Sequence, residues 1–193
     1  MKRITFVFSV LFSISLWAGN YVIDQAHTKV GFEITHMMIS TVEGQFKDYV
    51  ANFEYDEKTN TLNKVEAKIQ VASIDTENQK RDDHLRSEDF FDVKKFPTME
   101  FVSNEKLVIK PGEEKILKGK LTIKGITRNV DLKVRYVGSV KDPWGNERIG
   151  FEATTKINRR DYNITWNKLL EGGGLVVGDE VTIRIRGEGI KQK

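Results

Sequence analysis

Residues 117–136 read LKGKLTIKGITRNVDLKVRY, and the alternation within them decides the fold of this chain. Between positions 117 and 123, and again between 130 and 136, apolar residues or glycine take every second place, and lysine, threonine, aspartate or arginine fills the places between them. Because successive side chains of a strand point to opposite faces, each run predicts a strand with one buried face and one solvated face.

The same period of two recurs along most of the chain. Further strands are predicted at positions 30–35, 46–55, 65–71, 99–103, 151–157 and 181–186, which brings the count to about eight. Turn-forming residues separate several of them, at positions 110–112, 142–146 and 172–174. Strands of this kind form either a sandwich or a closed barrel, whose interior is filled or holds one small ligand. An outer-membrane barrel is disfavoured, because the lysines of the charged faces would lie in lipid.

One polar segment interrupts the strands. Residues 73–101 read SIDTENQKRDDHLRSEDFFDVKKFPTMEF, where Thr76 and Gln79 have the spacing of a capping box at a helix start. The predicted helix carries little apolar surface besides Leu85, and Pro97 closes the segment. The helix is either a lid or a plug at one barrel end, and its charged residues around Arg81 either solvate it or form a polar gate.

The first residues predict a secretory signal peptide. Lys2 and Arg3 precede an apolar run at positions 4–16, and Ala18 supplies a small residue for cleavage. The run is short for a membrane span, which disfavours an anchor. We therefore expect a signal peptide at residues 1–18 and one exported domain at residues 19–193.

Composition excludes several classes of protein. The 31 basic and 28 acidic residues are interleaved and give a formal net charge of only +3, which is not the footprint of a nucleic-acid-binding protein. The chain has no cysteine, so disulfides do not support the domain. The three histidines are widely spaced and offer no local zinc motif, and no cofactor is expected. No nucleotide-binding or hydrolase motif is present.

The whole domain resembles a known family. The residues that carry the resemblance include Ser73–Thr76, Arg81-Asp82, His84-Leu85, Asp89–Val93, Pro97, Phe101, Ile23-Asp24, His27-Thr28, Arg160–Tyr162 and Val177–Asp179. They are similar to the YceI-like family of periplasmic, lipocalin-like lipid-binding proteins. The resemblance implies an all-β, eight-stranded antiparallel lipocalin-like barrel with a helical insertion between strands. It also implies a periplasmic location, an elongated cavity for a polyisoprenoid or long acyl chain, and a dimer in many members.

The predicted function is a periplasmic carrier or sequestering protein for a long-chain apolar ligand: a polyisoprenoid, an isoprenoid quinone, a fatty acid or a fatty amide. The predicted ligand-binding residues are large and apolar: Phe32, Ile34, Phe46, Phe53, Ile69, Leu85, Phe90, Phe91, Met99, Phe101, Leu121, Ile123, Leu132, Val134, Phe151, Ile157, Trp166 and Ile183. Three polar residues, His27, His36 and Arg81, are candidates for contact with a ligand head group.

Two alternatives from other classes remain open. In one, Asp24, His27 or His36 performs acid–base chemistry on a lipid inside the same barrel. In the other, the apolar residues simply fill the interior and the protein is an interaction module. A transient contact with a membrane surface, a homodimer and modification of Asn163, which begins an Asn-Ile-Thr triplet, are also open.

Overall fold

A computed structural model describes residues 19–193, and the predicted signal peptide over residues 1–18 lies outside this range. The described chain is all-β with a single short α-helix, α1 (Gln79–Arg86). The strands are β1 (Gly19–Ile23), β2 (Lys29–His36), β3 (Ser40–Phe46), β4 (Tyr49–Asp56), β5 (Thr61–Gln70), β6 (Ile74–Asp75), β7 (Thr98–Ser103), β8 (Leu107–Val108), β9 (Glu114–Ile123), β10 (Ile126–Lys141), β11 (Glu147–Asn158) and β12 (Val177–Lys191). Three short 3-10 helices accompany them: η1 (Gln25–His27), η2 (Val71–Ser73) and η3 (Arg159–Tyr162).

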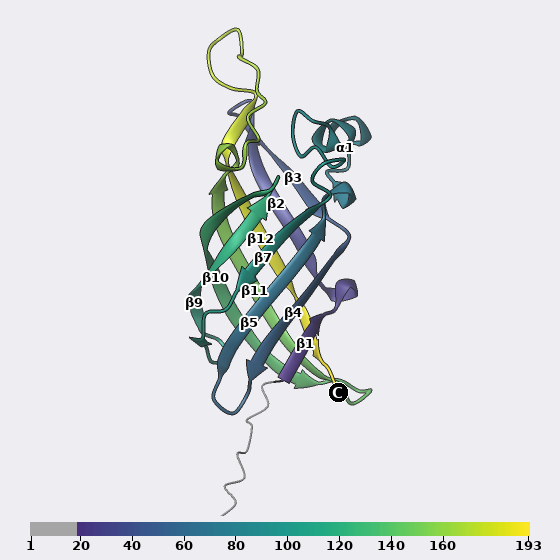
Figure 1. The fold of residues 1–193 in the computed structure, drawn as a ribbon, viewed down its shortest axis with the longest axis vertical. Coiled ribbons are helices and arrows are strands. Elements are labelled where there is room, and N and C mark those ends of the chain that lie inside the picture. Colours follow the sequence, from purple (N-terminus) through teal and green to yellow (C-terminus); the bar gives the residue numbers. More distant parts are fainter. Residues whose placement is uncertain (1–18) are drawn as a thin grey trace, which may run out of the picture.

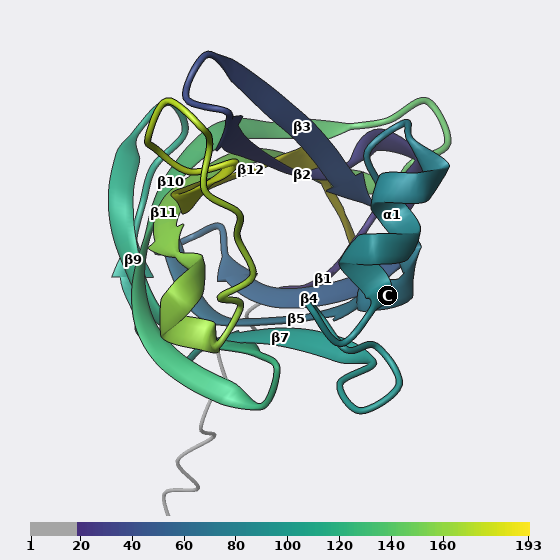
Figure 2. The same ribbon diagram turned by 90° about the horizontal axis from the view of Figure 1, so that it is seen from above.

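Eight strands close into an antiparallel barrel, as the family resemblance implied. They follow the order β1-β4-β5-β7-β9-β10-β11-β12, and β12 returns to pair with β1 at Tyr21 and Lys191. The other end of β12 pairs with β2 instead, and β3 and β6 continue the sheet from there. Figure 2 looks down the barrel and shows α1 lying beside its rim.

The barrel is elongated and its two ends differ (Figure 1). One end carries α1, the β2–β3 turn and the loop at residues 163–176, which connects η3 to β12. We call it the roof end. The floor end carries the β4–β5 turn, the β10–β11 turn and the C-terminus. Between residues 19 and 193, no helix is long and apolar enough to cross a membrane.

The predicted strand at positions 46–55 is wrong in its bounds. Phe46 ends β3, the chain breaks at residues 47–48, and β4 starts at Tyr49. The backbone N–H groups of Lys47 and Asp48 donate to Ser73 Oγ, at 3.2 and 3.0 Å, instead of to a neighbouring strand. The break separates β3 from β4. The strands β1, β6 and β8 were not predicted, and only Phe46 of β3 lay in a predicted strand.

The helix is present, but its predicted cap is wrong. Asn78 is the N-cap residue, and its side chain accepts a hydrogen bond of 3.1 Å from the backbone N–H of Arg81. The Thr76 hydroxyl instead donates to the carboxylate of Asp82, which is only 5% exposed. Arg81 and Arg86 donate to backbone carbonyls of residues 72–76, so polar contacts hold the helix against the end of the η2–β6 segment.

Candidate functional site

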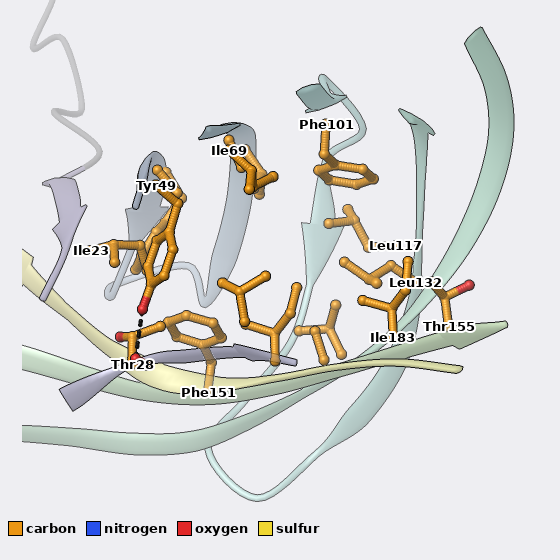
Figure 3. Close-up of a pocket in the computed structure, with 18 of the residues that line it drawn as sticks. Ile23, Thr28, Tyr49, Ile69, Phe101, Leu117, Leu132, Phe151, Thr155 and Ile183 are labelled. Carbon is orange, nitrogen blue, oxygen red and sulfur yellow. Dashed lines mark hydrogen bonds between the residues drawn. The ribbon is translucent and has the colours of Figure 1, made fainter. Parts of the chain in front are cut away.

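The barrel encloses a cavity of about 210 Å³, and nearly all of its lining is apolar. Strands from every part of the ring contribute side chains that point toward one another across it (Figure 3). The interior is therefore not completely filled, which argues against an interaction module with a packed barrel.

Two-thirds of the predicted ligand-binding set line this cavity. These residues are Phe32, Phe46, Phe53, Ile69, Met99, Phe101, Leu121, Ile123, Leu132, Val134, Phe151 and Ile183. Their position follows from the alternation of β2, β5, β9, β10 and β11, which turns every second side chain inward. That they contact a ligand stays a prediction.

Several lining residues were missed. Leu117, Tyr136 and Ala153 share the inward face of predicted strands and could have been included on that signal alone. Tyr49 likewise shares the face of Phe53 within the predicted strand at 46–55. Ile23 lies at the end of β1, which was not predicted. The other lining residues that were not predicted fall into the same two groups. Those on the inward face of a predicted strand include Val30, Tyr55, Val65, Val130 and Ile185. Those outside every predicted strand include Leu62, Ile109 and Ile149.

Hydroxyl groups at the cavity wall are bonded to the backbone. Tyr49 Oη donates to the Thr28 carbonyl at 2.6 Å, as the dashed line in Figure 3 shows. Thr155 Oγ1 donates to the Asp131 carbonyl at 2.8 Å, and Tyr55 Oη donates to the Ile109 carbonyl at 3.0 Å. Burial raises the pKa of both tyrosines, so they stay neutral. With their donors used, these groups leave the cavity surface apolar.

Glycines explain why the large rings leave space in the barrel. A Cβ on Gly44 would lie 2.3 Å from Phe32 Cζ, and a Cβ on Gly119 would lie 2.4 Å from Phe101 Cζ. The Phe53 ring lies in the same way against Gly189, 2.4 Å from the position of a Cβ. No side chain could stand where these rings lie, so glycine lets each ring lie along the wall. The open centre depends on this arrangement.

Two tyrosines form the floor of the cavity. The rings of Tyr55 and Tyr136 meet edge to face with centroids 5.1 Å apart, and both side chains are buried and line the cavity. Ile109 and Ile149, which are 2% and 4% exposed, lie at the same end. The floor is thus built from residues close to the strand ends and tied to the backbone by the Tyr55 hydrogen bond.

The roof is built from segments outside the barrel strands. Phe91, which follows α1, meets Phe46 edge to face at 6.1 Å. Trp166, from the loop at residues 163–176, contacts the rings of Phe90 and His84 at centroid distances of 5.2 and 4.9 Å. We call Phe90, Phe91 and Trp166 the roof cluster. It joins the helix segment to a loop more than seventy residues later in the sequence.

The remaining third of the predicted ligand-binding set does not line the cavity. Phe90, Phe91 and Trp166 lie in the roof cluster, and Leu85 is half-buried against the core beneath α1. Ile34 and Ile157 both pair at the level of Val181, which is one inward position nearer the roof than the Phe32–Ile183 pair. Ile34 lines a second groove, together with Met38 and Leu175. Ile34 and Ile157 lie in predicted strands and Leu85, Phe90 and Phe91 in the predicted insertion, whereas Trp166 was assigned to no element. Sequence periodicity does not show where along the barrel a cavity ends.

Arg159 fixes the roof loop. Its guanidinium is 3% exposed and donates to the carbonyls of Gly178, Ile164 and Trp166 at 2.7, 2.8 and 2.9 Å. Desolvation lowers its pKa from the usual value, and an ion pair with Asp179 Oδ1 at 3.2 Å opposes that effect. One buried cation therefore holds both ends of the loop at residues 163–176 together.

The three predicted head-group residues lie outside the cavity lining. Arg81 donates to the hydroxyl and carbonyl oxygens of Thr76 and so anchors α1. His36 ends β2 at the roof end. The side chain of His27 is 60% exposed and bonds to Asp24 Oδ2 at 2.8 Å on the outer surface. Asp24, His27 and His36 are thus not among the residues that line the cavity.

Asp24 belongs instead to an ion-pair network around Arg148. The guanidinium of Arg148 contacts carboxylate oxygens of Asp24, Asp142 and Glu188 at 2.6, 2.9 and 3.0 Å. Hydrogen bonds from His27 and Arg148 lower the pKa of Asp24 to about 2, and Arg148 likewise lowers that of Asp142. Ligand atoms of Asp24, His27 and Glu188 lie within 4.8 Å of one another, but Arg148 already supplies the positive charge between the two carboxylates.

Comparison with known proteins agrees with this architecture. Residues 21–189 match the YceI-like domain. The YceI protein of Salmonella newport is 40% identical over 188 residues, which cover 96% of this chain and 94% of that protein.

Solved structures share the fold. The YceI protein of Campylobacter jejuni superposes with a TM-score of 0.70 at 36% identity, covering 89% of this chain and 97% of that one. A polyisoprenoid binding domain from Saccharophagus degradans superposes with a TM-score of 0.63 at 13% identity, covering 91% and 99% of the two chains. The domain match and the identity over almost the whole chain show that this protein belongs to the YceI-like family.

Proposed function

We propose that this protein binds a long, flexible, apolar molecule inside its barrel and carries or sequesters it in the periplasm. The observation that carries the proposal is the cavity, whose wall hydroxyls are turned to the backbone and whose rings lie against glycines. Each methylene buried in such a space contributes roughly 0.8 kcal/mol before ordering costs. A polyisoprenoid, an isoprenoid quinone tail, a fatty acid or a fatty amide has this chemistry.

The size of the cavity favours a slender chain. Its volume of about 210 Å³ is below the roughly 300–1,000 Å³ of pockets that hold drug-sized molecules. A chain one methylene or one isoprene unit wide suits such a space better than a fused ring system. The polyisoprenoid binding domain from Saccharophagus degradans, which has the same fold, supports this ligand class.

Binding without chemistry is the function that the described residues favour. The Asp24–His27 pair lies on the outer surface, and burial raises the pKa of the wall tyrosines Tyr49 and Tyr55. A periplasmic carrier also agrees with the predicted signal peptide at residues 1–18. N-terminal sequencing of protein from the periplasmic fraction tests this location, and we expect a start near Gly19; an intact Met1 on membrane-embedded protein would contradict it.

The central experiment is organic extraction of the purified protein followed by mass spectrometry. We expect a long-chain apolar compound in the wild type and much less in Ala153→Phe, because Ala153 is 4% exposed and lines the cavity. Overpacking costs about 1–3 kcal/mol, which a domain of this size tolerates. Val140→Phe adds the same ring at a side chain that is 64% exposed and serves as the matched control. Full ligand content in a folded Ala153→Phe protein would place the ligand elsewhere.

A further inference from the structure

Two loops at the roof end expose a group of large apolar side chains. Met38, Ile39 and Leu169 are 69%, 88% and 83% exposed. The first two belong to the β2–β3 turn and the third to the loop at residues 163–176, and the Met37 N–H donates to the Val176 carbonyl at 2.8 Å, which ties the loops together. We call residues 37–39 with 169–175 the apolar tip. In Figure 1 the loop projects beyond the barrel and beyond α1.

The backbone of the tip is held in an unfavourable conformation. Met37 and Met38 have φ values of 49° and 61° and are the central residues of a turn in which the Ile39 N–H donates to the His36 carbonyl at 3.2 Å. A turn with both central residues in the left-handed region requires a positive φ at each of them. Asparagine followed by glycine satisfies that requirement best, and methionine is a poor choice on backbone grounds. Strain of this kind marks positions whose side chains have another task. We infer that this task is the exposure of the two methionine side chains at the tip.

The tip is also nearly free of charge. In a chain with 31% charged residues, positions 37–42 and 168–177 together contain only Lys168 and Glu171. Lys168 lies at the neck of the loop, where its carbonyl accepts a hydrogen bond of 3.1 Å from the Val176 N–H. A cation at the neck with apolar side chains beyond it complements a surface of phosphates over hydrocarbon. Glu171 near the apex limits the depth of insertion to the headgroup region.

The tip is continuous with the roof of the cavity. Trp166 of the roof cluster is three residues before Leu169 in the same loop, and Arg159 bonds to both the Trp166 and the Gly178 carbonyls. Residues 169–175 of the tip and Trp166 of the roof cluster therefore belong to one loop whose two ends Arg159 holds together. The opposite end carries an exposed aromatic, Trp144 at 81%, but on a turn beyond the buried floor.

We propose that the apolar tip docks on the surface of a lipid bilayer, so that the roof end faces the membrane from which the ligand enters. The biological role of this docking rests on the proposed function, but vesicle binding can be tested whether or not the protein carries a ligand. The contact is shallow and reversible, because few side chains insert and Glu171 stays with the head groups.

Vesicle flotation tests the proposal directly. The full mature chain is mixed with vesicles of phosphatidylethanolamine and phosphatidylglycerol, and the bound fraction is measured. We expect Ile39→Ser and Leu169→Ser each to weaken partitioning by roughly tenfold, the effect of removing one buried apolar side chain from a membrane contact. Trp144→Ser is the matched control at the floor end and should leave partitioning unchanged. A loss in Trp144→Ser with no loss in the tip variants would overturn the proposed orientation.

A second variant separates docking from folding. Replacing Met37-Met38 by Asn-Gly gives the turn its preferred residues, so thermal stability should rise while partitioning falls by tenfold or more. Stability and partitioning that rise together would refute the role given to the methionines. A second copy of the chain is the other partner that an apolar tip could bind, and sedimentation of each variant tests for it. If the tip substitutions dissociate a dimer and leave vesicle binding intact, the surface is a subunit interface and the proposal is wrong.

Lipid extraction distinguishes the two proposals. A protein that retains its extracted ligand but does not bind vesicles keeps the proposed function and loses this inference. A protein that binds vesicles through the tip but yields no ligand keeps this inference and loses the carrier function. Vesicles of phosphatidylcholine alone separate apolar insertion from attraction to anionic lipid, and we expect weaker binding that is still sensitive to Leu169→Ser.

Discussion

At the scale of single residues, three wall glycines determine whether the barrel is hollow. Gly119 is the clearest case, because a methyl group there would meet the Phe101 ring at 2.4 Å. The ring would have to turn away from the wall, and the nearest free space is the cavity. Strain and repacking should cost about 1–3 kcal/mol of unfolding free energy.

Gly119→Ala should therefore reduce ligand content more than it reduces stability. Extraction and mass spectrometry give the ligand content, and urea denaturation gives the stability. Gly172→Ala adds the same methyl group where nothing lies within 4 Å and should change neither quantity. Phe101→Leu in the Gly119→Ala background should restore binding. Unchanged ligand content in Gly119→Ala would show that ring position does not control the cavity.

The Arg148 network predicts a fall in stability in acid. The pKa of Asp24 is lowered from 3.8 to about 2 in the folded protein, so its contribution is complete above the unfolded value. That contribution is lost as the pH falls from about 4 toward 2, where the folded carboxylate also becomes protonated. Asp24→Asn should lower the urea midpoint at neutral pH and make the midpoint less dependent on pH in this window. Ligand content at neutral pH should not change, since Asp24 does not line the cavity. If the urea midpoint of Asp24→Asn depends on pH in the same way as that of the wild type, the Asp24 carboxylate does not contribute to the loss of stability in acid.

At the scale of elements, the roof loop depends on one buried cation. Arg159→Met leaves the carbonyls of Ile164, Trp166 and Gly178 without this donor, and breaking such a buried charged network costs about 3–5 kcal/mol. Arg160→Met, at a half-exposed neighbour, should stay within about 0.5 kcal/mol of wild type. Urea denaturation measures the free energy of unfolding of both variants. Tryptophan fluorescence should shift to the red in Arg159→Met as Trp166 loses its packing; equal stability of the two variants would contradict the clamp.

Local sequence patterns predicted strands well and their interruptions poorly. The strands at 117–123 and 130–136 lie within β9 and β10, since period-two alternation persists along each. The break at residues 47–48 follows from hydrogen bonds to Ser73, a partner that is distant in sequence. The N-cap moved from Thr76 to Asn78 for a similar reason, because Asp82 takes the Thr76 hydroxyl in a buried contact.

The candidate site shows the same limit. Alternation identified inward residues such as Phe101 and Leu132, but it does not distinguish a filled barrel from a hollow one. That difference arises from cross-strand neighbours such as Phe32 and Gly44, which only the register places opposite each other. The head-group candidates His27, His36 and Arg81 lie outside the cavity lining, because proximity to a barrel end in sequence does not determine which way a polar side chain points. That they contact a ligand head group stays a prediction.

At the scale of the whole molecule, binding should follow burial of apolar surface. Uptake of a long-chain ligand should show a negative heat-capacity change in titration calorimetry. Gln in place of His27, His36 or His84 should change affinity by about tenfold or less, equivalent to about 1.4 kcal/mol. Phe101→Ala should cost more, because its ring lines the cavity. A hundredfold loss in one histidine variant that stays folded would favour an enzyme or a polar site.

The tyrosine floor closes one end of the cavity and so limits the length of chain that the cavity can hold. Under the proposed function, a chain that enters through the roof should stop at the Tyr55–Tyr136 pair, so the distance from the roof cluster to these rings should set the longest tail that fits entirely inside. We expect Tyr136→Ala to shift the extracted ligands toward longer homologues, while Tyr136→Phe keeps the wild-type length distribution. Chain-length profiles from mass spectrometry compare the two. The protein would then select among members of one chemical series by length, without any polar contact to distinguish them.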